Sequence, residues 1–510
     1  MKDTAILGID IGTSSCKAIA VGRDGALLAS ATVGYPLSIP REGWSEQNPD
    51  DWIKGAGMAI AEVTGAIGST DVTAIGLTGQ MHGLTPLDRD LGVIRPAILW
   101  NDQRTEAECQ QITEAAGGLE GLLGMTNNPM LPGYTGGKIV WMRNHEPRNF
   151  ERMAHALNPK DYLRLKLTGE IATEVSDASG TGLFDVANRR WSSPLLEKTG
   201  IDAALLPRCT ESQEISGTVS KLGAELFGVA AETPVVGGGG DAVIQTIGSG
   251  IVSANMLQTT IGTAGIVATA LDGTPPNPDG RLQLFCNVAE DLWHCMGVSL
   301  NAGGAFSWLR SVLAGTGGPD GGNVDFGALV ERAEAAPPGS QGLLFLPYLW
   351  GERCPWPDPS ARAAFVGLTA GHGDNHLIRA LLEGVVFALA DMASLMTEMG
   401  LGEVARIHTS GGGSSASLWN QIQADVFGAK VATARGAAEG AAYGAALVAG
   451  LGTGVWDTPE DVAALCTIEG RWEPDAGNAA VYREMLSIYQ ELYIALRPTF
   501  RRLRDRSSAI

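Results

Sequence analysis

Two carboxylates lie beside glycine-rich stretches, and both could take part in chemistry. Asp241 follows four glycines, Gly237–Gly240, at the end of a predicted strand, and a helix is expected to begin there. A carboxylate at such a point could act as a general base for a substrate hydroxyl, because the glycines let a substrate come close. The structural alternative is a helix N-cap, for which Asp is a favoured residue.

Asp10 lies between Ile9 and Ile11 in an otherwise apolar predicted strand. An unpaired buried carboxylate is costly, so Asp10 either points to solvent at the end of the strand or holds a metal ion or water. The structural alternative is an edge aspartate that accepts the N–H groups of a turn. Magnesium usually takes only one or two protein carboxylates beside substrate phosphates. Because a Gly-Thr turn follows directly, the sequence favours a water-mediated Mg²⁺ contact at Asp10.

Two distant stretches share one design of apolar strand, Gly-Thr turn and second apolar strand. The first turn is Gly12-Thr13, and the second is Gly262-Thr263. Glycine lets backbone N–H groups approach an anion, and the threonine hydroxyl adds a donor. Two such turns facing each other would grip a polyphosphate from both sides, so the pattern predicts a duplicated, nucleotide-binding fold.

A third glycine run, Gly411, Gly412 and Gly413, lies between a predicted strand and a predicted helix. It could lie flat against an adenine or a ribose, although a plain tight turn is the alternative. The sequence has no G-x-x-x-x-G-K-[ST] motif, which disfavours a P-loop ATPase. The weak G-x-G-x-x-A match formed by Gly237, Gly239 and Ala242 lacks the acidic residue that a dinucleotide site requires about 20 residues further on.

Polar side chains end two predicted strands in the first half, at Gln80-Met81-His82 and at Trp100-Asn101-Asp102. Such groups suit a polyhydroxylated ligand. The alternatives are a structural histidine at His82 and an ordinary core residue at Trp100. The sequence contains neither the H-E-x-x-H motif of zinc proteases nor the G-x-S-x-G motif of serine hydrolases.

The predicted elements place these residues in two similar halves. Each half is expected to begin with a β-meander and to continue with alternating helices and strands, which pack best as mixed sheets covered by helices. We therefore predict a duplicated α/β fold with a central cleft between an N-terminal domain, 1–249, and a C-terminal domain, 250–510. The expected strands are 5–11, 17–21, 26–32, 72–77, 97–100, 233–236, a hairpin at 257–270, 282–288, 405–409 and 431–434, and the expected helices are 49–68, 242–248, 375–396, 415–427, 439–448 and 479–496.

Three details of the helices can be tested. Ser414 or Ser415 could cap the helix at 415–427, and Pro498 is expected to bend or end the last helix. One apolar face of that helix is predicted, namely Val481, Met485, Ile488, Leu492 and Leu496. The small-residue helices near 240–248 and 440–446 could cross closely, either as a hinge between the halves or as simple packing.

Composition sets the class of protein. The chain has 510 residues, of which 45% are hydrophobic, and a net charge of −20, which disfavours nucleic acid and anionic membranes as partners. Its seven scattered cysteines, without C-x-x-C spacing, indicate a reduced protein rather than a disulfide framework or zinc site. We expect no signal peptide and no apolar run of the length needed to span a membrane, hence a cytoplasmic protein.

Several motifs together resemble the FGGY carbohydrate kinases of the actin/hexokinase superfamily over nearly the whole chain. The motifs are Gly8–Thr13, Trp44–Gln47, Gly79–Gly83, Arg95–Asp102, Pro159–Arg164, Ser176–Thr181, Gly238–Asp241, Phe345–Leu349 and Gly351–Arg353, with the two family signatures near Gly133–His145 and Phe365–Glu383. The Met81–Gly83 and Trp100–Asp102 segments are most similar to the members that act on xylulose. Ala242 and Ala264 depart from the Asn and Ser that are common there.

The resemblance implies an actin-like, ribonuclease H-like ATPase fold and phosphorylation of D-xylulose by ATP with Mg²⁺ at the C5 hydroxyl, in pentose catabolism. It implies that Asp241 is the catalytic base, that Asp10 is the acidic residue of the first phosphate loop, and that Met81 and His82 contact the sugar. It also implies nucleotide-binding roles for Gly262, Thr263 and Gly412. Other sugars or polyols (ribulose, glycerol, gluconate), an actin-like ATPase without sugar transfer and a non-catalytic sugar sensor are the alternatives. The expected partners are the sugar and ATP, and a homodimer is an option.

Overall fold

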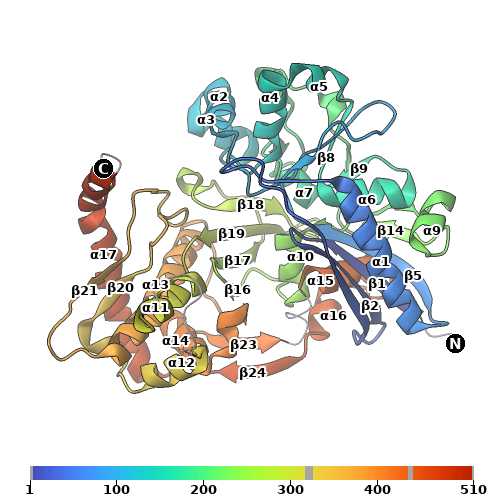
Figure 1. Ribbon diagram of the computed structural model, residues 1–510. Coiled ribbons are helices and arrows are strands. Elements are labelled where there is room, and N and C mark those ends of the chain that lie inside the picture. The colour runs from blue at the N-terminus through green and yellow to red at the C-terminus, as the bar shows by residue number, and fades with distance from the viewer. Residues whose placement is uncertain (1–3, 316–324, 435–439, 508–510) are drawn as a thin grey trace. The chain divides into compact units, whose positions relative to one another are not determined.

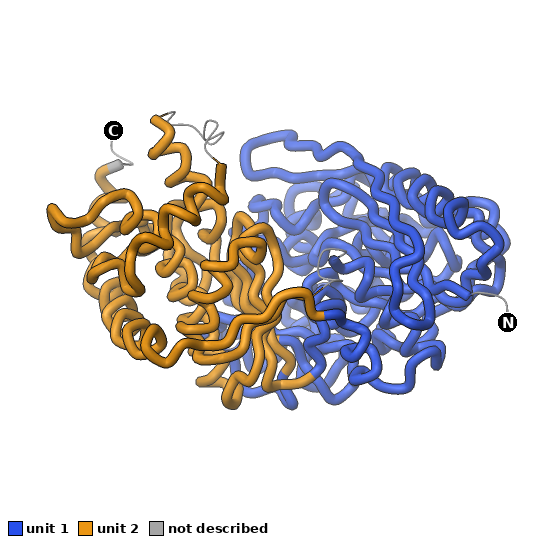
Figure 2. The backbone as a smooth tube through the Cα atoms, turned by 90° about the horizontal axis from the view of Figure 1, so that it is seen from below, with its two compact units in different colours: residues 1–252, 271–294, 439–467 blue, residues 253–270, 295–438, 468–510 orange. Residues whose placement is uncertain are grey.

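The computed structural model describes residues 4–315, 325–434 and 440–507. The described chain divides into two compact units, coloured separately in Figure 2. Unit 1 comprises residues 1–252, 271–294 and 439–467, and unit 2 comprises residues 253–270, 295–438 and 468–510. The predicted boundary near residue 250 lies beside the first switch between units, but two later segments join unit 1.

Unit 1 is built on a sheet with the strand order β13-β14-β5-β1-β2-β3. β1 (Thr4–Ile11), β2 (Ser15–Gly22) and β3 (Leu27–Gly34) form the predicted antiparallel meander, which turns at Gly22–Gly25. β5 (Asp71–Gly79) and β14 (Pro234–Val236) extend it in parallel, and β13 (Ile215–Thr218) closes the edge. A short strand, β15 (Gly239–Gly240), also pairs with β5.

Helices cover both faces of this sheet (Figure 1). Leu7, Ile9 and Ile11 point to one face, where they share a core with Trp52 and Ile60 of α1 (Pro49–Ile67). Successive side chains of a strand point to opposite faces, so Gly8 faces the other side. There α15 (Ala441–Gly452) contacts β1 and β5.

The two small-residue helices cross closely, as expected. A Cβ atom on Gly444 of α15 would lie 2.2 Å from the carbonyl oxygen of Ile244 in α10 (Asp241–Gly248). Both helices belong to unit 1. Close packing within one unit therefore explains their small residues, and the hinge between halves is not needed to explain them. The first residue of the predicted helix at 439–448 lies outside the described residues.

Unit 1 has a second core, which includes Tyr134, Trp141 and Leu183. The other helices of the unit are α2 (Glu106–Ala116), α3 (Gly118–Thr126), α4 (Thr135–His145), α5 (Pro147–Arg152), α6 (Pro159–Thr168), α7 (Val175–Ser179), α8 (Ser193–Thr199), α9 (Lys221–Phe227) and α16 (Pro459–Ala464). The other strands are β4 (Glu46–Gln47), β6 (Thr85–Leu87), β7 (Ala97–Ile98), β8 (His155–Leu157), β9 (Ala172–Glu174), β10 (Phe184–Asp185), β11 (Arg190–Trp191), β12 (Arg208–Thr210) and β18 (Gln283–Cys286).

Unit 2 repeats the strand arrangement of unit 1. Its sheet contains the strand order β19-β17-β16-β22-β23-β24. The strand β16 is antiparallel to β17 and parallel to β22. In unit 1, β1 is likewise antiparallel to β2 and parallel to β5. The strands are β16 (Met256–Ile261), β17 (Gly265–Leu271), β19 (Trp293–Ser299), β22 (Arg406–Ser410), β23 (Lys430–Ala434) and β24 (Ile468–Trp472), and β20 (Leu344–Leu346) pairs with β21 (Ala364–Val366). The helices are α11 (Gly303–Leu313), α12 (Phe326–Glu334), α13 (Asp374–Glu398), α14 (Ser417–Phe427) and α17 (Ala476–Ser507). This repetition confirms the predicted duplication.

One helix of unit 2 differs from the expectation about membrane spans. By length and composition α13 is long and apolar enough to cross a membrane, yet 89% of its apolar window is buried inside the protein. Burial in a core requires the same apolar composition, and so it accounts for this helix.

The predicted serine cap is wrong, and two predictions about the last helix are met only in part. The N-cap of α14 is Ala416 without a side-chain cap, because residues 412–415 form a 3₁₀ turn in front of it. Pro498 does not end α17 (Ala476–Ser507), and a bend at Pro498 stays a prediction. Met485 of the predicted face is buried, but Val481 and Ile488 are 40% and 47% exposed, and the other buried side chains are Tyr482, Tyr489, Tyr493 and Phe500.

Candidate active site

Strand register brings the two predicted catalytic carboxylates to the same edge of the unit 1 sheet. Thr78 of β5 is flanked by Asp10 of β1 on one side and by Gly239 of β15 on the other. Two residues beyond Gly239, Asp241 opens α10. The carboxyl ends of parallel strands meet at one edge of a sheet, which is where open α/β sheets bind ligands.

Asp241 does not serve as the cap of its helix. The N-cap is Gly240, and the Asp241 Oδ1 atom accepts the N–H of Ala242 at 2.8 Å. Burial and then the negative charge of Asp10 raise the pKa of Asp241 to about 7, against the opposing effect of that hydrogen bond. A carboxylate with a pKa near neutrality suits proton abstraction at the pH of a cell.

Asp10 is partly buried, and its surroundings disfavour the charged form of its carboxylate. Burial raises its pKa to about 6, although Lys17 of the neighbouring strand lowers it. Its Oδ1 atom is buried without a hydrogen-bond partner. Within the described ranges no group of three or more His, Cys, Asp or Glu residues could hold a metal ion. One carboxylate with an unsatisfied oxygen fits a Mg²⁺ ion that takes most of its ligands from water and phosphate.

The first Gly-Thr turn is held by side chains from three separate segments. The Tyr35 hydroxyl donates to the Gly12 carbonyl at 2.6 Å, and Gln47 Nε2 donates to the Thr13 carbonyl at 2.6 Å. Gln80 Nε2 donates to the Gly12 carbonyl at 3.3 Å and to Gln47 Oε1 at 3.1 Å. Sequence reasoning missed Tyr35 and Gln47 as supporting residues, and the Trp44–Gln47 motif was the available signal.

Met81 and His82 follow β5 and lie against the backbone near Asp241. Met81 is 3% exposed, and a Cβ atom on Gly240 would lie 2.5 Å from its Cγ. His82 has a positive φ of 67°, and its ring stacks on Tyr134 with centroids 4.5 Å apart. Because its Nδ1 atom lies at hydrogen-bond distance from the carbonyl oxygen of Gly180, Nδ1 carries the proton.

A buried lysine fixes the backbone of His82. Lys138 of α4 is 0% exposed, and its Nζ donates to the carbonyl oxygens of His82 at 2.7 Å and Gly133 at 2.6 Å. Thr135 Oγ1 donates to the same His82 carbonyl at 3.0 Å. Burial lowers the pKa of Lys138 to about 7. The sequence signal was the first family signature, which contains Lys138.

Trp100 and Asn101 connect the predicted sugar segment to the first turn. Trp100 is 43% exposed, not a core residue, and its Nε1 donates to Thr13 Oγ1 at 2.9 Å. The Oδ1 atom of Asn101 is buried without a hydrogen-bond partner. Asp102 anchors the segment by accepting the Ser45 N–H at 2.6 Å and pairing with Arg104. An exposed indole and an unsatisfied amide oxygen are groups that a sugar could use.

In unit 2, the second Gly-Thr turn rests on the start of α11. The Gly262 carbonyl accepts the N–H of Gly303 at 2.8 Å, and the Thr263 carbonyl accepts the N–H of Ala302 at 3.1 Å. A Cβ atom on Gly303 would lie 2.6 Å from the Gly262 oxygen, so this approach requires a glycine.

A cavity of about 580 Å³ lies beside this turn within unit 2. Both Gly262 and Thr263 line it, as do Gly412 and Gly413, and its aromatic lining residues are Phe306, Phe326 and Trp419. Gly411 precedes them with a φ of 81°. The volume is in the range of small-molecule sites, and the aromatic rings are groups against which a heterocyclic base could stack.

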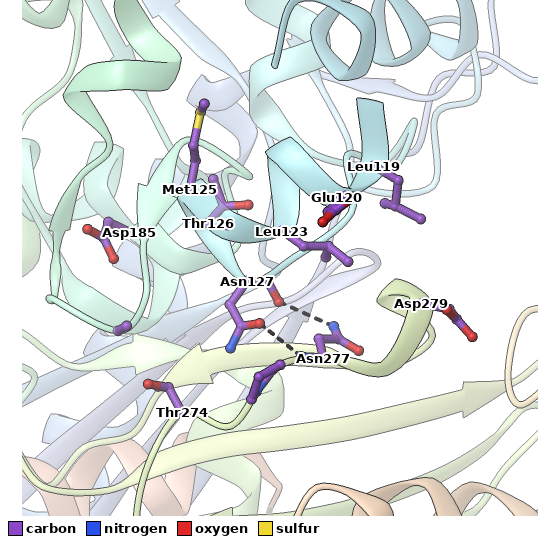
Figure 3. A pocket seen from close by; sticks show the side chains of 13 residues that line it. Leu119, Glu120, Leu123, Met125, Thr126, Asn127, Asp185, Thr274, Asn277 and Asp279 are labelled. Atoms are coloured by element: carbon purple, nitrogen blue, oxygen red, sulfur yellow. Dashed lines mark hydrogen bonds between the residues drawn. The ribbon is translucent and has the colours of Figure 1, made fainter. Parts of the chain in front are cut away.

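A second cavity, of about 700 Å³, belongs to unit 1 and is shown in Figure 3. Asn127 and Asn277 hydrogen-bond to each other along it, with Asn277 N–H donating to Asn127 Oδ1 at 3.0 Å. None of the predicted site residues lines it, and Glu120, Asp185 and Asp279 do. Three carboxylates would repel a nucleotide phosphate, so this cavity is not a candidate for ATP.

The predicted site residues therefore fall into two groups. Unit 1 holds Asp10, Gly12, Thr13, Met81, His82, Trp100, Asn101 and Asp241, and unit 2 holds Gly262, Thr263, Gly411, Gly412 and Gly413. Within unit 1 the Trp100–Thr13 hydrogen bond and the Met81–Gly240 packing join them into one site. The predicted meeting of the two Gly-Thr turns stays a prediction, because the turns belong to different units.

Comparison with known proteins identifies the class. Residues 5–248 match the N-terminal domain, and residues 257–453 the C-terminal domain, of the FGGY family of carbohydrate kinases. The chain is 36% identical over 498 residues to a xylulose kinase from Bacillus subtilis, covering 96% of each chain. It is 30% identical over 505 residues to a gluconokinase of that organism, covering 98% of each. The crystal structure of xylulose kinase from Rhodospirillum rubrum matches with 30% identity and a TM-score of 0.90, over 98% of this chain and 100% of that one.

The chain therefore belongs to the FGGY family of carbohydrate kinases. The family and the sheets repeated in both units confirm the predicted duplicated α/β fold of the actin-like type.

Proposed function

We propose that this protein is a cytoplasmic xylulokinase that transfers the γ-phosphoryl group of ATP to the C5 hydroxyl of D-xylulose, giving D-xylulose 5-phosphate and ADP. The observation that carries the proposal is the Asp241 carboxylate, whose pKa is raised to about 7 at a ligand-binding sheet edge of a family kinase. The choice of sugar rests on the 36% identity to a xylulose kinase.

In the proposed reaction, Asp241 accepts the proton of the C5 hydroxyl. The hydroxyl oxygen forms the new bond to the γ-phosphorus, and the bond from that phosphorus to the bridging oxygen of ADP breaks. Positioning and charge stabilisation supply most of the rate in such transfers. A Mg²⁺ ion bound with ATP would neutralise phosphate charge, and Asp10 would hold it through water, as its unsatisfied Oδ1 suggests.

The sugar would bind in unit 1 beside Met81, His82, Trp100 and Asn101. The exposed Trp100 ring offers an apolar face to a sugar, and its hydrogen bond to Thr13 would keep that face next to the phosphate-binding turn. Gly12 and Thr13 would receive the phosphates from one side. In unit 2, Gly262 and Thr263 would bind phosphate, and Gly411–Gly413 with the aromatic cavity would bind adenosine.

Turnover of a sugar panel tests this function. ADP release by the purified protein should be fastest with D-xylulose, compared with D-ribulose, glycerol, D-gluconate and no sugar. Highest turnover with D-gluconate would support the second candidate, which the 30% identity to a gluconokinase favours. Equal ADP release without any sugar would contradict both and indicate an ATPase.

The role of Asp241 is tested by removing its charge. Asp241→Asn should bind xylulose yet lower kcat about 10²–10⁴-fold, the contribution typical of a general base. The measurement is steady-state ADP release together with sugar binding by calorimetry. Asp185→Asn, a carboxylate of the Figure 3 cavity, serves as the control and should keep normal turnover. A kcat for Asp241→Asn within threefold of the wild type would contradict the assignment.

A further inference from the structure

Five charged side chains are buried together in unit 1, behind the glycine run that leads to Asp241. Lys160, Asp161, Arg164, Glu174 and Asp177 are each at most 1% exposed. Lys160 Nζ lies 2.7 Å from Asp161, 3.3 Å from Asp177 and 3.6 Å from Glu174. Burying charges costs free energy that their pairing rarely returns in full, and apolar residues would stabilise a core at least as well. The reaction described above makes no use of this cluster.

One end of the cluster holds the start of the glycine run. Arg164 Nη1 donates to the Val236 carbonyl at 2.9 Å, and Nη2 donates to the Gly237 carbonyl at 2.5 Å. A charged, planar guanidinium donor fixes two successive carbonyls more rigidly than water could. The end of β14 is thereby oriented where the chain leaves the sheet.

The other end of the cluster holds the residue before Asp241. Ser176 Oγ donates its only proton to Glu174 Oε1 at 2.9 Å and accepts the Gly240 N–H at 2.9 Å. Glu174 in turn accepts the Ser176 N–H at 2.7 Å and the Asp177 N–H at 2.8 Å. Because a hydroxyl has one proton, the carboxylate fixes the direction of the hydroxyl, and the hydroxyl then presents a lone pair to Gly240.

The glycine run needs such support because it has no side chains of its own to pack. Gly238 has a φ of 72°, and a Cβ atom there would lie 1.9 Å from the Leu77 carbonyl oxygen, so the position requires glycine. Glycine retains the most backbone freedom in the absence of such contacts. The glycine run is held by its pairing with β5 and by hydrogen bonds of its backbone. Among these, the hydrogen bond from the Gly240 N–H to Ser176 Oγ lies nearest in sequence to Asp241.

We propose that Ser176, held in place by Glu174, is a positioning residue that sets the orientation of Asp241 for proton transfer. This inference rests on the proposed role of Asp241 as the base. It assigns a function to the Ser176–Thr181 motif and to the buried charges, which otherwise have none in the reaction.

A matched pair of serines tests the inference. Ser212 Oγ donates to Glu174 Oε2 at 2.9 Å, and Ser212 is 0% exposed, as is Ser176. Ser212 contacts the glycine run through its backbone carbonyl, which accepts the Gly238 N–H at 2.8 Å and stays in place when the hydroxyl is removed. Both Ser176→Ala and Ser212→Ala remove one hydroxyl from the same carboxylate. Only Ser176→Ala should lower kcat, by about 10-fold to 100-fold at saturating ATP and xylulose, with the KM for ATP within twofold of the wild type. Thermal unfolding should shift by similar amounts in both variants.

Two outcomes would overturn the inference, namely equal kcat values for the two variants and a change in KM for the sugar without a change in kcat. If Ser176→Ala does not fold, Ser176→Cys replaces it, since a thiol has nearly the same shape but is a weak acceptor, and the same loss of kcat is expected. Wild-type turnover of xylulose is measured first. Its absence would contradict the proposed function, whereas an active wild type with an unaffected Ser176→Ala variant would contradict this inference alone.

Discussion

Asp241 shows how position, rather than residue type, produces a base. The structure places a second carboxylate, Asp10, near enough to raise the pKa of Asp241 beyond the effect of burial. Like charges that share a site favour protonation of one of them. The raised pKa that makes Asp241 a good proton acceptor also makes its charged form unfavourable in the folded protein.

The rate should therefore depend on pH. Only ionised Asp241 can take the hydroxyl proton, so kcat/KM for xylulose should fall about tenfold per pH unit below about 7. The measurement is initial rate between pH 5 and 9 at saturating Mg²⁺ and ATP. A rate that stays constant down to pH 5 would contradict a base with this pKa.

Stability should respond in the opposite direction to activity. Between about pH 4 and 7 the folded protein binds a proton at Asp241 that the unfolded chain has released, so stability falls as pH rises through this window. Asp241→Asn removes this cost and should raise stability at pH 8 by about 1–3 kcal/mol. The gain in melting temperature should shrink to near zero at pH 4. A variant less stable than the wild type at pH 8 would refute this account.

At the scale of elements, glycines decide how closely helices approach the unit 1 sheet. Gly8 of β1 and Gly76 of β5 are register partners, and Cβ atoms there would lie 2.0 and 1.8 Å from carbonyl oxygens of α15. Gly444 of α15 makes the same kind of approach to α10, the helix that Asp241 opens. The sheet packs on α15 and α15 packs on α10, in both cases with backbone atoms in direct contact. This packing fixes the position of α10, the helix that carries the proposed base.

Gly444→Ala should break this stacking. The new methyl group would lie 2.2 Å from the Ile244 carbonyl oxygen, so we expect a loss of about 1–3 kcal/mol or more in the free energy of unfolding. Gly65→Ala is the control, because Gly65 lies in α1 with no atom within 4 Å of the added Cβ, and it should stabilise by about 0.5–1 kcal/mol. Urea denaturation of both variants provides the measurement. A neutral Gly444→Ala would mean that α10 and α15 can separate without cost.

At the scale of the whole molecule, the two units are expected to bind different ligands. D-xylulose alone should slow amide hydrogen exchange mainly in unit 1 peptides that contain His82 or Asp241. A non-hydrolysable ATP analogue alone should slow exchange mainly in unit 2 peptides that contain Gly262 or Gly412, because a ligand stabilises the elements it contacts. Protection of unit 2 alone by xylulose would contradict the predicted assignment of sugar binding to the N-terminal half.

Local patterns predicted most strands and helices, because alternation and helical spacing depend on neighbours in sequence. These patterns failed where a side chain contacts a residue that is distant in sequence. In α17 the spacing of aliphatic residues predicted one buried face, but Tyr482, Tyr489 and Tyr493 of the neighbouring face are buried. Their hydroxyls form hydrogen bonds with residues in distant segments, namely Glu383, Tyr348 and Asp358 respectively. The predicted serine cap of α14 failed for a local reason, because the Ser414 and Ser415 hydroxyls donate back to the Gly411 and Gly412 carbonyls within a 3₁₀ turn.

By itself, the sequence determined the strand-turn-strand units, the glycine turns and the identity of the polar residues at the strand ends, all of which are local properties. Only the tertiary structure decided that residues 440–467 pack with the first unit and that Asp10 and Gly239 flank one threonine, Thr78. It also decided that Ser176 reaches Gly240 across 64 positions of chain. Pairing, burial and the pKa values that follow from them arise between segments far apart in sequence, where no local pattern records the contact.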